Sequence, residues 1–135
     1  MRKVILILLM GLLLVSCKSE EVIWKSIEVT ASAYNSLENQ TSDQPNLGAW
    51  GDTLKPGMKC IAVSRDLLSM GIDHNTKVKI TGLKGIYLVK DKMNERWTNK
   101  IDIYMGENIK QAREWGSKKV TIQYAINPDE LQNAL

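Results

Sequence analysis

The stretch Ile27-Glu-Val-Thr-Ala-Ser-Ala-Tyr34 alternates between apolar and more polar side chains. Successive side chains of a β-strand point to opposite faces, so residues two apart share a face. One face of this stretch would carry Ile27, Val29, Ala31 and Ala33, and the other Glu28, Thr30, Ser32 and Tyr34. The period predicts a half-buried strand, the first of the fold.

Further segments rich in Val, Ile and Tyr, separated by Gly or Asn, predict strands over residues 58–64, 77–81, 85–91, 100–105 and 118–125. A short helix is predicted over 107–115, because Glu107 favours a helix start and Gly116 a helix end. A second helical turn is predicted over 65–70. Six strands with so little helix indicate an all-β fold, and closing them into a barrel would leave few strand edges exposed.

The chain begins with the features of a bacterial lipoprotein signal peptide, over residues 1–16. Arg2 and Lys3 precede a short apolar run, and Leu14-Val-Ser-Cys17 resembles a lipobox, in which the cysteine becomes the lipidated N-terminus. The apolar run is shorter than the roughly 18 to 20 residues that cross a bilayer. After the signal we expect a tether over 17–26, one domain over 27–125 and a tail over 126–135.

The charge balance argues against a nucleic-acid partner. The 135 residues include 18 Lys and Arg against 15 Asp and Glu, and removal of Arg2 and Lys3 with the signal would leave a net charge near +1. That is too little for a basic binding face. If Cys17 carries lipid, Cys60 has no disulfide partner, and its apolar neighbours predict a buried thiol.

Most catalytic constellations are missing from the sequence. The single histidine, His74, stands among turn-forming residues and is expected to be an exposed loop residue. One histidine and two cysteines cannot supply a zinc cluster, and neither a phosphate-binding glycine loop nor a serine-nucleophile elbow occurs. We therefore expect no metal and no cofactor, and any catalysis would depend on carboxylates.

Two aspartates stand on neighbouring predicted strands. Asp91 ends the strand over 85–91, and Asp102 points away from Ile101 and Ile103 in the next one. Aspartate is depleted in strands. If the two strands pair as antiparallel neighbours, the carboxylates can approach each other, whereas a solvated strand face is the structural alternative. The loop over 35–57 is long for a connection without periodicity and is expected to lie over a site.

Together these segments resemble the 3D domain, a family named for three aspartates and related to the C-terminal part of the membrane-bound lytic transglycosylase A family. The resemblance covers about residues 29–122 and includes the spacing from Asp91 to Asp102. Ser64 stands where members often carry the first aspartate, with Asp66 two residues later, and Lys92-Met-Asn94 replaces a frequent Thr-Gly-Gly. The matching segments are Thr30-Ala-Ser-Ala-Tyr34, Ile61-Ala-Val63 with Gly71, residues 85–91, Ile101-Asp-Ile-Tyr104 and Ala112-Arg-Glu-Trp-Gly116.

The resemblance implies a six-stranded double-psi β-barrel and non-hydrolytic cleavage of peptidoglycan between N-acetylmuramic acid and N-acetylglucosamine, giving a 1,6-anhydro end. One carboxyl suffices: it donates a proton to the leaving oxygen and then accepts one from the C6 hydroxyl. An ordinary aspartate, with a pKa near 3.9, is ionised at neutral pH. Desolvation and a nearby second carboxylate would raise the pKa. We assign the acid/base role to Asp102 and the supporting charge to Asp91.

The candidates for substrate binding are hydroxyl, aromatic and basic side chains. Each also has a structural interpretation, as a strand-face, turn, core or solvated residue. Trp50 is the preferred platform for a sugar ring, because it lies in the long loop. The hydroxyl candidates are Thr30, Tyr34 and Thr41, the flat rings are Trp50, Trp97 and Tyr104, and the bases for peptide-stem carboxylates are Lys55, Lys90 and Lys92.

Three other functions stay open: a hydrolase, a non-catalytic peptidoglycan-binding barrel, and a structural envelope lipoprotein that docks another protein. The expected partners are peptidoglycan strands and the membrane, through the lipid on Cys17. Lys18 after that cysteine favours sorting to the outer membrane. We expect a monomer.

Overall fold

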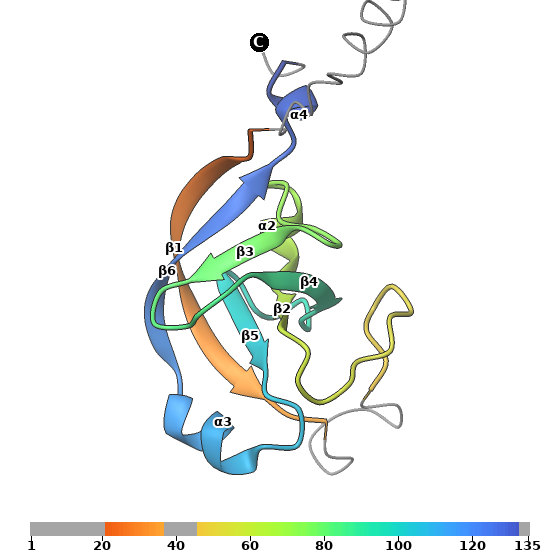
Figure 1. Cartoon of the computed structure of the whole chain (residues 1–135), viewed down its shortest axis with the longest axis vertical. Coiled ribbons are helices and arrows are strands. Elements are labelled where there is room, and N and C mark those ends of the chain that lie inside the picture. Colours follow the sequence, from red (N-terminus) through yellow and green to blue (C-terminus); the bar gives the residue numbers. More distant parts are fainter. Residues whose placement is uncertain (1–20, 37–45, 133–135) are drawn as a thin grey trace, which may run out of the picture.

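The computed structural model describes residues 21–36 and 46–132. Within these ranges six strands form one closed barrel in the order β1-β5-β2-β4-β3-β6 (Figure 1). This order confirms the predicted all-β, six-stranded barrel. The strands are β1 (Ile23–Tyr34), β2 (Cys60–Val63), β3 (Lys77–Ile80), β4 (Tyr87–Lys92), β5 (Lys100–Tyr104) and β6 (Lys118–Ile126).

The barrel mixes parallel and antiparallel pairs. β1 is parallel to β5 and β2 is parallel to β4, whereas the other four neighbouring pairs are antiparallel. Parallel neighbours cannot be joined by a tight hairpin, so the chain must cross the barrel between them. Two such parallel pairs within six closed strands agree with the double-psi arrangement. β1 and β6 run side by side along one flank (Figure 1).

The interior is filled by the apolar faces of the strands. Val29 and Ala31 are fully buried in β1, as their alternation with polar residues predicts. Ile101 and Ile103 enter the same core from β5, so Asp102 between them points outward. The other core side chains come from β2, β3, β4, β6, α2 and the turn after α2: Ile61, Val63, Leu67, Ile72, Val78, Ile80, Tyr87, Val89, Ile122 and Tyr124.

Helices are short and lie at the ends of the barrel: α2 (Arg65–Leu68), α3 (Ile109–Trp115) and α4 (Pro128–Gln132). The first two were predicted, although α3 is capped by Asn108, whose side chain accepts a hydrogen bond from the Gln111 amide. The segment predicted as a tail, over 126–135, contains the last residue of β6 and all of α4. The tether prediction was wrong from Ile23 onward, because residues 23–26 already pair with β6.

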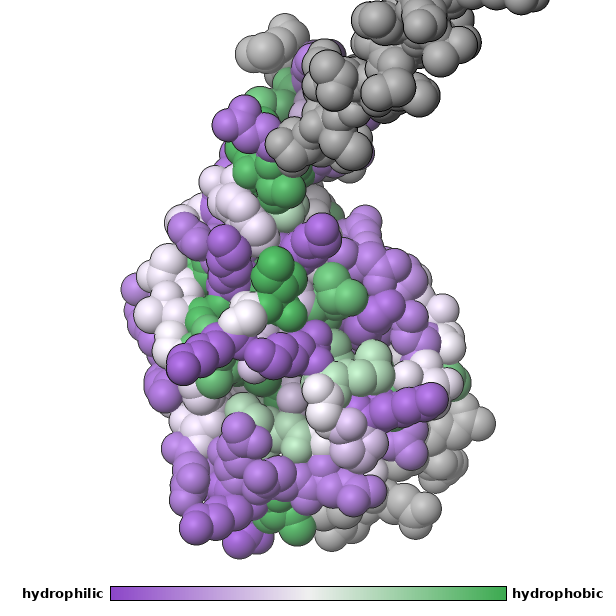
Figure 2. All heavy atoms as spheres, in the orientation of Figure 1, coloured by the Kyte–Doolittle hydropathy of each residue, from purple (hydrophilic) through white to green (hydrophobic). Residues whose placement is uncertain are grey.

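The surface carries hydrophobic residues in small groups. Figure 2 shows such groups near the junction of β6 with α4 and over the middle of the barrel, with hydrophilic side chains between them. In the described part of the chain, no helix has the length and apolar character needed to cross a membrane.

Candidate functional site

The two aspartates lie in one row across four strands. Ser32 of β1 pairs with Asp102 of β5, Asp102 pairs with Ala62 of β2, and Ala62 pairs with Asp91 of β4. The prediction that the two aspartate strands are neighbours was wrong, because β2 lies between them. Two strand spacings of about 4.8 Å place the two backbones roughly 10 Å apart. Ala62 therefore separates the carboxylates and offers only a methyl group between them.

A β-bulge selects the aspartate that enters this row. Ile61 pairs with Val89, but the next residue, Ala62, pairs with Asp91, so the register skips Lys90. An uninterrupted ladder would bring Lys90 beside Ala62. Bulges re-aim side chains in this way and are frequent near active sites. Here the bulge exchanges a cation for a second carboxylate.

Both aspartates line one hollow of about 210 Å³ on the outer side of the barrel wall. Its floor is the Asp91-Ala62-Asp102 row, and Tyr34 from β1 borders it. The end of β4 and the loop that follows it form the other side, with Lys92, Met93, Asn94 and Trp97. The hollow thus joins four strands and one loop.

Asp91 is held by backbone amides. Its Oδ1 accepts hydrogen bonds from the Ala49 and Lys92 N–H groups, both at 2.9 Å. Burial raises the pKa of Asp91, while these two amides and the Lys92 charge oppose the rise. Two amide donors favour the ionised form. Asp91 is therefore the better anchored anion of the pair.

Asp102 has a less polar environment. Burial raises the pKa of its carboxyl, and the charge of Asp91 adds to the rise, against a hydrogen bond from Ser32 and the positive charge of Lys100. The Ser32 hydroxyl donates to Oδ1 at 3.1 Å. A hydroxyl stabilises a carboxylate less than two amides do, so Asp102 is the better proton holder.

Tyr34 adds an unsatisfied hydroxyl to the same hollow. Within the described residues, its buried oxygen has no hydrogen-bond partner. Burial raises the pKa of Tyr34 far above its usual value, and the charges of Asp91 and Asp102 add to the rise. The phenol therefore stays protonated. Buried hydroxyls are normally paired, so Tyr34 is ready to donate to a ligand.

The long loop was predicted to lie over the site, and its described end lies beside the hollow, whereas residues 37–45 lie outside the described residues. The described end of the loop turns back at the Leu47–Thr53 bridge and supplies the Ala49 amide to Asp91. Gly48 lies against the Lys90 carbonyl so closely that a Cβ would collide with it. The loop is thus clamped onto β4 beside the hollow.

An ion-pair network fixes this loop from the other side. Asp52 binds Lys90 Nζ at 2.9 Å and His74 Nε2 at 2.6 Å, and the His74 ring stacks on Trp50 at 4.7 Å. Lys90 also donates to the Asn75 side chain at 2.6 Å. His74 lies in a loop, as predicted, but the prediction that it is exposed was wrong, because it is half-buried between Asp52 and Trp50. The sequence contains no local signal for these contacts, because the partners are far apart along the chain.

The structure brings only some of the predicted binding residues together. Tyr34 lines the hollow, whereas Thr30 pairs with Lys100 and Lys119 outside it, and Thr41 and Cys17 lie outside the described residues. Lys90 is neutralised by Asp52.

The structure does not favour Trp50 or Tyr104 as the ring that binds a sugar. Trp50 packs against His74 and does not line the hollow. Tyr104 is 3% exposed, because it packs on Tyr34 and forms a small cluster with Leu54 and buried Cys60. Burial raises the pKa of the Cys60 thiol to about 12, so it is unreactive. Trp97, 37% exposed, is the ring that borders the hollow.

Ser64 and Asp66, considered above for the position of a third aspartate, have structural roles. Ser64 is buried, and its hydroxyl accepts the Lys100 amide at 2.9 Å. Asp66 accepts the Asn99 amide at 2.8 Å and does not line the hollow. These contacts brace the loop that carries Trp97, so neither residue supplies a third carboxylate to the row.

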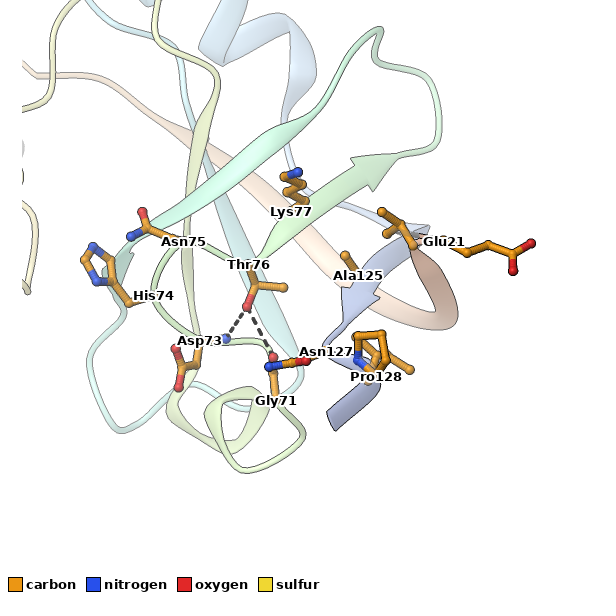
Figure 3. A pocket seen from close by; sticks show the side chains of 12 residues that line it. Glu21, Gly71, Asp73, His74, Asn75, Thr76, Lys77, Ala125, Asn127 and Pro128 are labelled. Carbon is orange, nitrogen blue, oxygen red and sulfur yellow. Dashed lines mark hydrogen bonds between the residues drawn. The ribbon is translucent and has the colours of Figure 1, made fainter. Parts of the chain in front are cut away.

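A second hollow, of about 460 Å³, lies at the end of the barrel where β1 begins (Figure 3). Its side chains diverge: His74 and Glu21 stand on opposite sides, and Lys77 points away from Asp73. The Thr76 hydroxyl is used within the turn, between the Asp73 amide and the Gly71 carbonyl. Although larger, this hollow has no convergent set of free polar groups. In residues 21–36 and 46–132, no cluster of His, Cys, Asp or Glu could hold a metal ion.

The sequence matches no known family model and no curated protein. Among solved structures, it is similar to the expansin of Clavibacter michiganensis in its apo form, with a TM-score of 0.46 and 17% identity over 77% of this chain and 52% of that one. An aspartate-to-asparagine mutant of that expansin in complex with cellohexaose gives a TM-score of 0.46 and 15% identity over 76% of this chain and 51% of that one. The present chain spans about half the length of these proteins.

Proposed function

We propose that the hollow binds a peptidoglycan strand and that Asp102 cleaves it as a lytic transglycosylase, at the bond between N-acetylmuramic acid and N-acetylglucosamine. The observation that carries the proposal is the row Asp102-Ala62-Asp91, in which two carboxylates of raised pKa face one hollow across a single alanine. Raised carboxyl pKa values in a concave site are typical of acid/base catalysis.

The chemistry requires a proton donor that becomes a proton acceptor. Asp102, neutral at the start, protonates the glycosidic oxygen as the bond to C1 breaks. The resulting carboxylate removes the proton of the muramyl C6 hydroxyl while that oxygen bonds to C1, which closes the anhydro ring and restores the acid. Asp91 stays ionised on its two amides and stabilises positive charge on the sugar. Tyr34 donates its free hydroxyl to a sugar oxygen.

The asymmetry of the pair favours this reaction over hydrolysis. A hydrolase uses both carboxylates, the second as a nucleophile or as a base for water. The two amides on Asp91 Oδ1 lower the basicity of that carboxylate, which suits an electrostatic role better than proton abstraction.

The test is digestion of purified sacculi by the full chain beside its Asp102→Asn variant, with the products identified by mass. Anhydro ends that require Asp102 support the proposal. Reducing ends would mean a hydrolase, and retained sacculus binding without any product would mean a binding module. An absence of both sacculus binding and products in the two chains would leave only a docking role.

Lipid anchorage at Cys17 belongs to the same proposal. The expected result is a mass increase of the mature N-terminus by a diacylglycerol group, with fractionation into the outer membrane. A Cys17→Ala chain recovered in the same membrane fraction would contradict it.

A further inference from the structure

Three basic side chains lie at the hollow or against a ring that lines it: Lys92 lines the hollow, and Lys100 and Arg96 lie over Trp97, which also lines it. Lys100 Nζ lies 3.8 Å from the Trp97 ring centre and the Arg96 guanidinium lies 5.0 Å from it. Lys92 Nζ lies 4.8 Å from the ring of Trp50. Among the described residues, none of these three cations forms an ion pair with a carboxylate. Each lies against an indole ring, and in this described part of the chain none is in direct contact with a carboxylate partner.

The cations lie close to the two carboxylates. Lys100 precedes Asp102 by two residues on β5 and so shares its face. Lys92 follows Asp91 and lines the hollow itself. The neighbouring Lys90, in contrast, is already neutralised by Asp52. The free positive charge is therefore concentrated at the edge of the site, around an acidic floor.

A ligand that approaches Trp97 meets these positive charges and not the uncovered indole ring. Two cations lie over its indole, which a neutral sugar would have to displace in order to stack there. Cations over an aromatic ring keep their positive charge accessible at the outer side. An ammonium group that is half-buried but accessible from one side binds an anion more strongly than a fully solvated ammonium group, because less water competes with the anion. The mouth is thus better suited to an acidic ligand than to a neutral one.

We propose that Lys92, Arg96 and Lys100 form a subsite for a carboxylate on the glycan, next to the bond that the aspartates act on. The inference rests on the proposed function, because it takes the hollow as a glycan site. The chemistry required is a sugar that carries a carboxylate. The lactyl group of muramic acid, the acids of a peptide stem and a uronic acid all supply it.

Binding measurements separate these sources. The full chain carrying Asp102→Asn, in mild detergent, would be titrated calorimetrically with glycan strands stripped of peptide stems, the same strands with their carboxyls amidated, stem-bearing strands, neutral chitin oligosaccharides and oligogalacturonate. We expect the stripped strands to bind about tenfold more tightly than the amidated ones, with the difference shrinking as salt is added. Tighter binding of stem-bearing strands would place the carboxylate on the peptide, and equal binding of oligogalacturonate would extend the subsite to uronic acids.

Substitutions test the three cations. Lys92→Gln, Arg96→Gln and Lys100→Gln should each weaken binding of stripped strands by about fivefold, as expected for one partly exposed ion pair, and leave chitin binding unchanged. Lys118→Gln is the matched control, because Lys118 Nζ also lies 3.8 Å from an indole, but that indole belongs to Trp115, which does not line the hollow. Lys100→Arg should restore the preference.

Equal affinity for native and amidated strands, or an equal effect of Lys118→Gln and Lys100→Gln, would overturn the subsite. Failure of the proposed function looks different. If the native chain released no anhydro products but the carboxylate preference persisted, the subsite would be supported and the proposed cleavage activity would be contradicted. If cleavage persisted with no carboxylate preference, only the subsite would fall.

Discussion

Two acidic sites on the same barrel differ in the direction of their pKa shifts. Asp52 is bound by Lys90 and His74, and these partners lower the pKa of its carboxyl. Asp91 and Asp102 are half-buried beside Ala62, and this burial raises the pKa of both. A paired carboxylate is a structural element, because its charge is already compensated. A partly desolvated carboxylate that faces a hollow is available for proton transfer.

The largest effect is expected from Asp102→Asn. The amide cannot exchange a proton with the substrate, so cleavage of sacculi should fall by about 10² to 10⁴-fold, measured as the rate of anhydro product release. Asp91→Asn should cause a smaller loss, because its role is electrostatic. Asp73→Asn, at an exposed position beside the second hollow, serves as a control and should leave the rate unchanged. A residual rate within tenfold of the native one in Asp102→Asn would rule out the acid/base role.

Gly48→Ala tests the link between the loop and the acidic row. The new Cβ would collide with the Lys90 carbonyl, so the loop must shift and withdraw the Ala49 amide from Asp91. We expect a loss of about 1 to 3 kcal/mol in the free energy of unfolding, from urea titration, together with slower cleavage. Gly51→Ala lies in the same loop and meets open space, although its φ of +88° makes it strained. Gly51→Ala should lower the free energy of unfolding but slow cleavage less than Gly48→Ala does. If stability and cleavage fell in the same proportion in both variants, the Ala49 amide would have no role in the activity.

The pH dependence of stability should differ in sign between the two acidic sites. The pKa of Asp102 is raised in the fold, so its ionisation destabilises the native protein as pH rises above the unfolded value near 3.9. Asp102→Asn should therefore raise the melting temperature at neutral pH. The pKa of Asp52 is lowered, so its charge stabilises the fold above that value, and Asp52→Asn should lower the melting temperature at neutral pH.

Both differences should vanish in acid, where each carboxyl is protonated in the folded and unfolded chains. Melting curves of the native chain and the two variants between neutral and acidic pH would show this. A lower melting temperature for Asp102→Asn at neutral pH would mean that its charge is compensated like that of Asp52.

The smallest effect concerns two neighbouring tyrosines. Tyr34 has an unpaired buried hydroxyl, whereas the Tyr104 hydroxyl donates to Ser36 at 3.3 Å. Removing an unsatisfied group is neutral or stabilising, and removing a paired one costs about 1 kcal/mol. Chemical denaturation should therefore show Tyr34→Phe at least as stable as the native chain and Tyr104→Phe less stable. Glycan binding should weaken only in Tyr34→Phe, and a stability loss there would reveal a partner for its hydroxyl.

Local periodicity was enough to predict the barrel's strands and the outward direction of Asp102. Alternation in β1 and β5 identifies the buried faces, because a sheet with one apolar face leaves little freedom in register. The family resemblance supplied the pairing of Asp91 with Asp102 in one site. The strands and the direction of Asp102 follow from residues within single strands, and the pairing of the two aspartates follows from a matched spacing.

The remaining features depend on contacts between distant segments. No local sequence pattern predicts the β-bulge opposite Ala62, which pairs Ala62 with Asp91 and not with Lys90. The insertion of β2 between the aspartate strands follows from closure of the barrel as a whole. Trp50 looked like a sugar platform by its position in a loop, but its partner His74 lies in another turn. Packing of loops on the barrel wall decides which rings and charges remain free.

The most direct test of the acid role of Asp102 is a titration of the aspartate side chains, followed by the carbon-13 resonances of their carboxyl groups. We expect Asp102 to titrate at a pH above the usual aspartate value of 3.8 and Asp52 below it, and we expect Asp91→Asn to move the Asp102 midpoint downward. If Asp102 titrates at or below the usual value and does not respond to loss of Asp91, the two carboxylates do not act as a pair and Asp102 cannot serve as the acid.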